Sequence, residues 1–204
     1  LPSFGAVRLR LTGTADGQPN LRGRMLALLP ALRERIGEYI FAEEETTLET
    51  TIGKLLLEKG LTLATAESCT GGLVAHRITG VAGSSAYFRG SVVAYHNDIK
   101  VSELNVPTET LVTSGAVSEA TARAMAEGAC RRLGADVAVA TSGVAGPSGG
   151  TPEKPVGTIC IAVADAQGTV SKQFSFDRGR DLNITYTAQA VLTLLWQRLM
   201  GITQ

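Results

Sequence analysis

The stretch LTLATAESCTGG, residues 61–72, decides the fold, because an apolar run with strand character leads directly into a turn of small residues. Ser68 follows the run, and Gly71 and Gly72 come shortly after it. A serine in this position can hold its hydroxyl beside backbone N–H groups from which no carbonyl accepts. Such donors suit an oxyanion or a phosphate. The stretch therefore predicts a strand that brings a nucleophile, Ser68, to a helix N-terminus.

Two other interpretations of this stretch remain open from the sequence alone. The turn can be an ordinary strand-to-helix connection in which Ser68 or Thr70 is the N-cap. Cys69 is a rival nucleophile, because a thiolate at a helix N-terminus is also activated. We expect the Cys69 side chain to point into the packing beside the turn.

Strands and helices alternate from residue 61 onward. Strands are expected at 61–66, 91–95, 136–142, 156–164 and 169–176, and helices at 71–79, 98–104, 118–133 and 181–200. The last two strands are joined across Asp165–Gly168 and predict an antiparallel hairpin. The sequence therefore predicts an α/β fold, a three-layer domain with a mixed β-sheet covered by helices on both faces.

The organisation of the chain changes near residue 45. Residues 6–12 alternate like a strand, and 21–40 have the pattern of an amphipathic helix that Pro30 interrupts. After a polar connector, Thr47 is expected to cap a helix that runs to Gly60, with an apolar stripe made of Leu48, Ile52, Leu55, Leu56 and Leu57. We interpret residues 1–45 as a small α/β remnant of a preceding domain with its linker, and 46–204 as the main domain. Because the chain begins with Leu1 instead of Met, we expect a piece of a longer protein.

Composition excludes several classes of function. The 204 residues carry 19 basic and 19 acidic side chains, so the formal charge is zero and no nucleic-acid partner is indicated. The three cysteines are too few and too widely spaced for a disulfide framework or a zinc site, so we expect no metal and a reducing compartment. A signal peptide and an apolar run near 18 residues are both missing, so we expect a soluble, cytoplasmic protein without membrane contact.

A second group of candidate residues lies in GSVVAYHNDIK, residues 90–100. If a strand ends at Tyr95 and Asn97 caps the next helix, Tyr95 and Lys100 can face one cleft. A lysine beside apolar walls loses proton affinity and can act as a base for a serine, and a tyrosine can relay the proton. The alternative makes Tyr95 an aromatic at the edge of the core and Lys100 a surface side chain. His96 and His76 are expected to be structural or exposed, because no carboxylate stands at a triad spacing from them.

A third candidate region is the glycine-rich loop within residues 141–158, which follows an apolar strand. Glycines let backbone N–H groups approach a ligand closely, and prolines stiffen the loop, so it is suited to a phosphate and a ribose. The loop matches neither the P-loop pattern nor the dinucleotide-binding GxGxxG pattern. A purely structural long loop is the alternative.

Taken in order, five motifs resemble the C-terminal domain of the CinA family, the competence/damage-inducible protein A family. They are AESCTGG (66–72), GSS (83–85), VAYHNDIK (93–100), SGAVSEATARAMAEGA (114–129) and TSGVAGPSGGTPEKPVGT (141–158). The resemblance covers about residues 48–200. It implies a nicotinamide-nucleotide amidohydrolase of NAD metabolism, which converts nicotinamide mononucleotide and water to nicotinic acid mononucleotide and ammonia without a cofactor. It further implies a homo-oligomer and, in the full-length protein, an N-terminal pyrophosphatase-type domain.

The resemblance also implies roles for individual residues. Ser68 corresponds to the nucleophile, and Tyr95 and Lys100 complete the catalytic set. The residues expected to bind the substrate are Thr70, Gly71, Gly72, Ser84, Ser142, Gly143, Gly146, Gly149, Gly150, Lys154, Arg178 and Arg180. Either arginine can hold the phosphate, but Thr185 stands where the family usually has a second arginine, and threonine cannot bind phosphate bidentately.

These roles predict acyl transfer. Neutral Lys100, helped by Tyr95, takes the Ser68 proton, and N–H groups from Cys69 to Gly71 stabilise the oxyanion. The alternative function is a catalytically silent module that senses a nucleotide or binds a protein in competence and recombination.

Overall fold

The computed structural model describes residues 2–3, 6–14 and 19–202. The chain forms two compact units, Leu1–Glu45 and Thr46–Gln204. This is also where the sequence analysis divides the chain.

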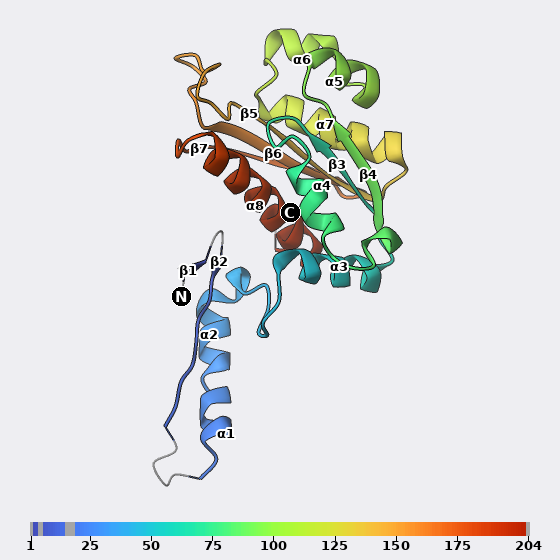
Figure 1. Ribbon diagram of the computed structural model, residues 1–204. Helices are drawn as coiled ribbons and strands as arrows, with labels where there is room; N and C mark the ends of the chain where they lie inside the picture. Colours follow the sequence, from blue (N-terminus) through green and yellow to red (C-terminus); the bar gives the residue numbers. More distant parts are fainter. Residues whose placement is uncertain (1, 4–5, 15–18, 203–204) are drawn as a thin grey trace. The chain divides into compact units, whose positions relative to one another are not determined.

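The second unit is built on a five-stranded mixed sheet (Figure 1). Its strands are β3 (Leu63–Glu67), β4 (Phe88–Val93), β5 (Val137–Gly143), β6 (Thr158–Asp165) and β7 (Gly168–Ser175). The order in the sheet is β4-β3-β5-β6-β7. β3 pairs in parallel with β4 and β5, whereas β6 is antiparallel to β5 and β7. The predicted mixed sheet and the predicted hairpin are both confirmed.

Helices cover both faces of this sheet, as predicted. One face carries α8 (Arg180–Leu199), which packs on β5 and β6 and against α3 (Leu48–Lys59) and α4 (Leu73–Thr79). The other face carries α7 (Glu119–Leu133), together with α5 (Asn97–Leu104) and α6 (Thr108–Thr113).

The core beneath α7 consists mainly of small side chains. Alanines from β3, β5 and β6 pack against alanines and Met125 of α7. At Gly128 of α7 the approach to α5 is so close that a Cβ atom would lie 2.0 Å from the Leu104 carbonyl oxygen. Small side chains let backbones come together at this distance, which accounts for the Ala- and Gly-rich composition.

Local capping signals set the ends of the best-predicted helices. The Thr47 side chain accepts the Thr50 N–H at the start of α3, and Gly60 ends that helix at φ 65°. Ser118 caps α7 in the same way. Three details differ from prediction: Leu57 is 54% exposed and lies outside the apolar stripe, His96 replaces Asn97 as the cap of α5, and α6 was missed.

The direction of the chain connections changes at the carboxyl end of β3, the strand that lies between β4 and β5 in the sheet. The chain leaves β3 through α4 on one face, and it leaves β4 through α5 to α7 on the other face. Ligands of α/β proteins bind outside the carboxyl ends of the strands at such a topological switch point, so we expect a site here. Ser68 follows β3 directly, and Tyr95 follows β4 after Ala94.

The first unit contains a short antiparallel pair, β1 (Pro2–Ser3) and β2 (Ala6–Val7), then α1 (Leu21–Leu26), α2 (Leu29–Ile36) and the 3₁₀ turn η1 (Gly37–Tyr39). The strand expected at 6–12 is therefore limited to β2. The helix expected at 21–40 is divided into α1 and α2, because Pro30 occupies the first turn of α2, where its missing N–H breaks no bond.

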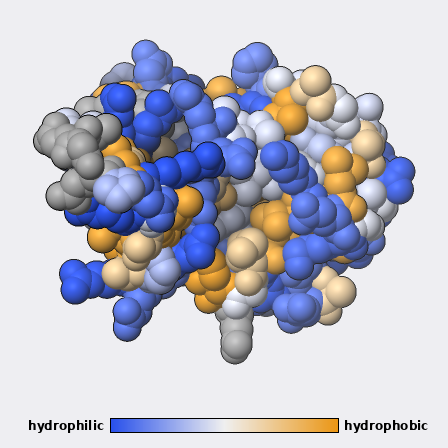
Figure 2. All heavy atoms as spheres, turned by 90° about the horizontal axis from the view of Figure 1, so that it is seen from below, coloured by the Kyte–Doolittle hydropathy of each residue, from blue (hydrophilic) through white to orange (hydrophobic). Residues whose placement is uncertain are grey.

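Neither α1 nor α2, both described throughout, contains a buried residue. Val7, Leu26 and Tyr39 are examples of apolar side chains that stay exposed in this unit. Figure 2 shows hydrophobic residues scattered among hydrophilic ones over the face that it draws. Among the helices in the described ranges, none combines the length and the apolar character needed to cross a membrane.

Candidate active site

The Ser68 turn joins β3 to α4. The Ser68 N–H donates to the Thr141 carbonyl at 2.9 Å, so the pairing of β3 with β5 continues one residue beyond the strand. Ser68 is 9% exposed, and its Oγ forms no hydrogen bond within the described part of the chain. Gly72 is the N-cap of α4, with φ 102° and no side-chain cap. The interpretation of Ser68 or Thr70 as N-cap is therefore wrong.

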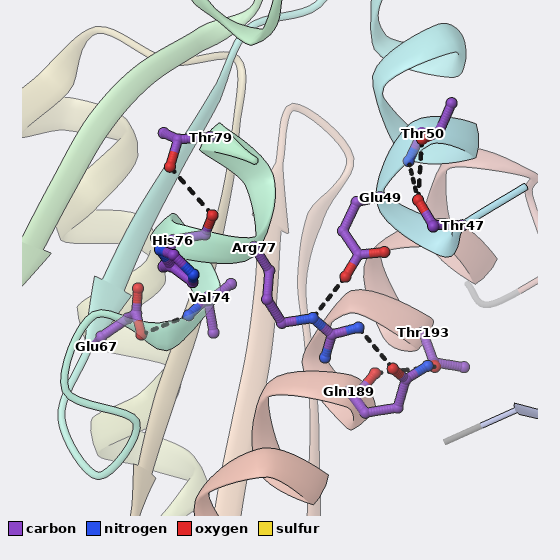
Figure 3. Close-up of polar contacts among 10 residues, drawn as sticks. All are labelled: Thr47, Glu49, Thr50, Glu67, Val74, His76, Arg77, Thr79, Gln189 and Thr193. Atoms are coloured by element: carbon purple, nitrogen blue, oxygen red, sulfur yellow. Dashed lines mark hydrogen bonds and ion pairs between the residues drawn. The ribbon is translucent and has the colours of Figure 1, made fainter. Parts of the chain in front are cut away.

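The side chain that does occupy the N-terminus of α4 is Glu67, the last residue of β3. Its carboxylate accepts hydrogen bonds from the N–H groups of Gly72 (3.0 Å) and Ala75 (2.8 Å). It also accepts the Val74 N–H at 3.0 Å, and this is the contact that Figure 3 draws. Glu67 is fully buried. The sequence analysis missed this residue, although an acidic side chain between the apolar strand and the small-residue turn was a visible signal. The donors of the helix terminus are thus largely occupied from within the protein.

Two N–H groups of the turn remain open. The Gly71 N–H donates to the Ser68 carbonyl at 3.1 Å, and the Gly72 N–H is bound to Glu67. Over the described residues, the N–H groups of Cys69 and Thr70 donate to no other residue. The expected donor set, Cys69 to Gly71, is corrected to Cys69 and Thr70. Gly71 and Gly72 instead provide positive φ angles, 60° and 102°, which glycine adopts without strain.

Lys100 is almost completely buried, at 1% exposure. Its Nζ donates to the carbonyls of Ala94 (2.9 Å) and Tyr95 (3.4 Å), and within the described ranges it forms no ion pair. Burial lowers the pKa of Lys100, because desolvation disfavours the charged ammonium. The alternative that made Lys100 a surface side chain is wrong.

Cys69 lies close enough to Lys100 that each influences the pKa of the other. Burial is the largest effect on Cys69 and raises the pKa of its thiol to about 12. The thiol is therefore protonated at neutral pH, unlike the activated thiolate that a nucleophilic cysteine needs. This favours Ser68 over Cys69 as the nucleophile of the turn.

Arg180 connects the exit of β4 to the glycine-rich loop. Its Nη1 donates to the Gly146 carbonyl at 2.7 Å, and its Nη2 donates to the Tyr95 hydroxyl at 3.1 Å. Tyr95 is 60% exposed, so it is not an aromatic at the edge of the core. Of the two candidate arginines, Arg180 has its guanidinium at this edge of the sheet, whereas Arg178 contributes a backbone N–H to Asn183 Oδ1 at 3.0 Å.

Asn183, a fully buried residue that the sequence analysis missed, holds the glycine-rich loop. Its Nδ2 donates to the Ala145 carbonyl at 3.0 Å. The predicted ligands Ser142 and Lys154 make similar internal contacts, because their side chains donate to the carbonyls of Ala116 and Ser114. Both side chains thus link the loop to the segment before α7.

The glycines of the loop are needed by its backbone. A Cβ at Gly143 would lie 2.9 Å from the Thr158 carbonyl oxygen, and one at Gly150 would lie 2.7 Å from the Val156 nitrogen. Gly146 and Gly149 adopt positive φ angles of 87° and 90°. The loop therefore needs glycine at these positions for close backbone contacts and for positive φ angles.

Ser84 is not brought to this edge of the sheet. It begins the 3₁₀ turn η2 (Ser84–Ala86), which precedes β4. The neighbouring Tyr87 carbonyl accepts the Leu63 N–H at 2.7 Å, at the start of β3. Because β3 and β4 are parallel, Ser84 lies near their amino ends, whereas Ser68 follows their carboxyl ends. The structure therefore separates Ser84 from the other predicted site residues.

The histidines contribute nothing to this arrangement. His96 is exposed and accepts the Asp98 N–H at 3.3 Å, and His76 lies within α4. In the portion of the chain that the structure describes, no group of three His, Cys, Asp or Glu side chains is placed to hold a metal ion.

The site can now be compared with known proteins. The family model of the CinA C-terminal domain matches residues 45–199. The chain belongs to the CinA family. It is 47% identical over 199 residues to a CinA-like protein of Cytophaga hutchinsonii, a match that covers 98% of this chain and 48% of the relative. A putative competence-damage inducible protein of Symbiobacterium thermophilum is 56% identical over 158 residues, 78% of this chain and 37% of that protein.

Solved structures of the family have the same fold. The competence/damage inducible protein CihA from Agrobacterium tumefaciens has a TM-score of 0.71 and 42% identity, over 77% of this chain and 94% of that one. A CinA superfamily protein from Klebsiella pneumoniae has a TM-score of 0.73 and 32% identity, over 76% and 96%. The chain spans about half the length of the curated relatives that it matches.

Proposed function

We propose that this chain is a nicotinamide-nucleotide amidohydrolase that releases ammonia from nicotinamide mononucleotide through a Ser68 acyl-enzyme. One observation carries the proposal. Lys100 is buried and has no carboxylate partner among the described residues, and it interacts with Cys69 of a turn whose Ser68 hydroxyl forms no hydrogen bond to any of those residues. Ionisable groups whose pKa is shifted by burial are candidates for catalytic residues.

Lys100 is suited to the role of general base. A lysine serves as a base only when it is neutral, and its ordinary pKa of about 10.4 keeps it charged at neutral pH. Desolvation shifts the pKa of Lys100 downward, and in the described structure no acidic side chain opposes this shift through an ion pair. The amine can therefore take a proton from Ser68 and later return it to the leaving ammonia.

The turn supplies the proposed nucleophile and the proposed hydrogen-bond donors for the oxyanion. Within the residues that the structure describes, Ser68 Oγ has no hydrogen bond to break before it attacks, and the open N–H groups of Cys69 and Thr70 are the candidates for binding the oxyanion. Attack forms a bond between Oγ and the carboxamide carbon, and the C–N bond then breaks as ammonia leaves. Water hydrolyses the resulting ester and restores the serine.

Arg180 is the candidate for recognition of the substrate phosphate. Its guanidinium already bridges the Gly146 carbonyl and the Tyr95 hydroxyl, so it lies between the glycine-rich loop and the segment that follows β4. Guanidinium binds phosphate bidentately. Thr185, in contrast, donates its hydroxyl to the Asp181 carbonyl at 2.7 Å, within its own helix. Arg180 is therefore proposed to bind the phosphate without help from Thr185.

A second candidate function is a silent module that binds a nucleotide at the same site. One observation favours it: Lys100 Nζ donates to main-chain carbonyls, and within the described residues Ser68 has no hydrogen bond to Lys100 or Tyr95. In that case the amine would be a structural anchor.

Ammonia release from nicotinamide mononucleotide by the purified protein separates these functions. We expect turnover by the natural chain and none by Ser68→Ala, with nucleotide binding near normal in calorimetry, because the hydroxyl reacts and does not anchor. Cys69→Ala is the matched control, and it should retain turnover. Activity retained in Ser68→Ala but lost in Cys69→Ala would reverse the assignment of the nucleophile. Binding without turnover would support the silent module.

A further inference from the structure

We propose that Glu67 is a positioning residue that keeps the Ser68 turn competent, an inference that rests on the proposed function. Its carboxylate lies at the one point where β3, the turn and α4 meet. The proposal concerns a contact within the protein and not a ligand site, because Glu67 itself fills the N-terminus of α4.

The hydrogen bonds of Glu67 connect three successive pieces of chain. One carboxylate oxygen, Oε2, accepts from the Thr70 hydroxyl (2.7 Å) and from the N–H groups of Gly72 and Val74 (both 3.0 Å). The other, Oε1, accepts from the Ala75 N–H at 2.8 Å. Glu67 thus holds both ends of the segment from Ser68 to Gly71. Its backbone precedes Ser68, and its side chain binds the N–H groups that follow Gly71.

The hydrogen bonds continue to the neighbouring strand β5. A carboxylate only accepts hydrogen bonds, so the Thr70 hydroxyl must donate to Glu67. The Thr70 hydroxyl is also 2.8 Å from the hydroxyl of Thr141 on β5, and Thr141 must then be the donor in that contact. Thr141 also accepts the Ser68 N–H through its carbonyl. The turn is therefore fixed from both sides, which leaves the Cys69 and Thr70 N–H groups open beside Ser68.

An amide cannot replace this carboxylate. Glutamine has the size of glutamate, but its NH₂ group would face N–H donors in either orientation, those of Gly72 and Val74 or that of Ala75. The Glu67 side chain is fully buried, so solvent cannot reach its oxygens to replace the lost acceptor, although the Gly72 and Ala75 N–H groups are only part-buried. Glu67→Gln should therefore move the turn while leaving the Arg180 region unchanged.

The other end of α4 provides a matched control. Arg77 in the last turn of α4 pairs with Glu49 of α3 and donates to Gln189 of α8 at 2.7 Å (Figure 3). Glu49→Gln removes an acid that also anchors α4, but it does not touch the Ser68 turn. A loss of activity that only reflects weaker anchoring of α4 should appear in both Glu67→Gln and Glu49→Gln.

The test compares Glu67→Gln and Glu49→Gln in two assays. With nicotinamide mononucleotide, we expect Glu67→Gln to lower kcat by roughly 100-fold, the effect of losing an oxyanion donor, with KM within about 3-fold of the natural chain. Glu49→Gln should keep kcat within about 3-fold even if its melting temperature falls. Thr70→Ala should lower kcat less than Glu67→Gln, because the three main-chain contacts of Glu67 remain.

The second assay does not depend on the nucleotide. A fluorophosphonate phosphonylates an activated serine: Oγ bonds to phosphorus, fluoride leaves and the serine proton passes to the base. Intact mass should show labelling that Ser68→Ala abolishes and that Glu67→Gln slows by the same factor as kcat. If the natural chain releases no ammonia but is labelled, the proposed function fails and the role of Glu67 is still tested.

Three results would overturn the role of Glu67. The first is a Glu67→Gln variant whose kcat and labelling rate both stay within about 3-fold of the natural chain while its melting temperature falls. Glu67 would then be only a helix cap. The second is a raised KM at constant kcat, which would place Glu67 in substrate binding. The third is a natural chain in which Ser68 is not labelled.

Discussion

The amino and carboxyl ends of the parallel strands β3, β4 and β5, here called the amino edge and the carboxyl edge of the sheet, differ in how their charged side chains are paired. At the amino edge, both oxygens of Asp165 accept from Arg198 at 2.7 Å, and Asp136 accepts from the Thr62 N–H (2.8 Å) and hydroxyl (2.6 Å). At the carboxyl edge, Lys100 is buried with no carboxylate partner in the described chain, and Ser68 Oγ is unbonded.

This difference separates stability from function. Bonds from Arg198 and from Thr62 hold the pKa values of Asp165 and Asp136 below their ordinary range, so these charges stabilise the folded state. Burial lowers the pKa of Lys100, so its charged form opposes folding. A group kept in an unfavourable charge state is typical of a site selected for chemistry.

The largest effect should come from restoring a permanent charge at the carboxyl edge. Lys100→Arg should reduce ammonia release about 10³-fold, nearly as much as Lys100→Ala, because arginine does not lose its proton near neutral pH. Steady-state kinetics of both variants would measure this. Substantial activity in Lys100→Arg would mean that residue 100 acts as a fixed charge, and the contrast between the edges would lose its functional meaning.

A smaller effect is expected at the glycine-rich loop. Arg180→Ala should raise KM for nicotinamide mononucleotide by about 10- to 100-fold with little change in kcat, since a charge-assisted contact contributes roughly 1.5–3 kcal/mol. Arg178→Ala is the control, because the Arg178 guanidinium forms no hydrogen bond to the loop within the described residues, and KM should be unchanged in this variant. Equal effects of the two substitutions would assign the phosphate contact to both arginines.

At the amino edge, loss of charge should change stability and not turnover. Asp165→Asn removes the carboxylate that accepts from the buried Arg198 guanidinium and should lower the free energy of unfolding by about 3 kcal/mol, while kcat and KM stay unchanged. Urea unfolding measures the change. In the natural chain, the stabilisation from Asp165 is present above the unfolded pKa of 3.8 and should be lost as the pH falls through the lower folded pKa. An Asp165→Asn variant that loses turnover would contradict the separation of the two edges.

Removal of metal ions is expected to have no effect on activity. Excess EDTA should leave ammonia release unchanged, because the proposed chemistry needs only Ser68, Lys100 and main-chain donors. Inhibition that zinc or magnesium reverses would show that the carboxyl edge is completed by a metal ion.

The sequence was most informative where a local signal sets the structure. Thr47, Gly60 and Ser118 bound their helices as predicted, because capping depends on side chains within one turn. Pro30 likewise marked the division between α1 and α2. The hairpin of β6 and β7 could be predicted because its strands are adjacent along the chain.

The parts that could not be predicted depend on distant packing. The burial of Lys100 could not be predicted from the pattern of its short helix, because it depends on the packing of α5 against α7. The role of Glu67 depends on where the N–H groups of Gly72 to Ala75 lie once α4 has formed. Ser84 was assigned to the site by its motif, but strand order places it at the other edge.

The contact between Gly128 and the Leu104 carbonyl connects the core to the proposed chemistry. Leu104 ends α5, the helix that carries Lys100, and a single added methyl group at residue 128 would collide with the Leu104 backbone. The position of the Lys100 amine therefore depends partly on Gly128, a residue without a side chain. In a CinA protein of this type, an inactive descendant can retain Ser68, Tyr95 and Lys100 unchanged and differ only in the size of one side chain between two helices.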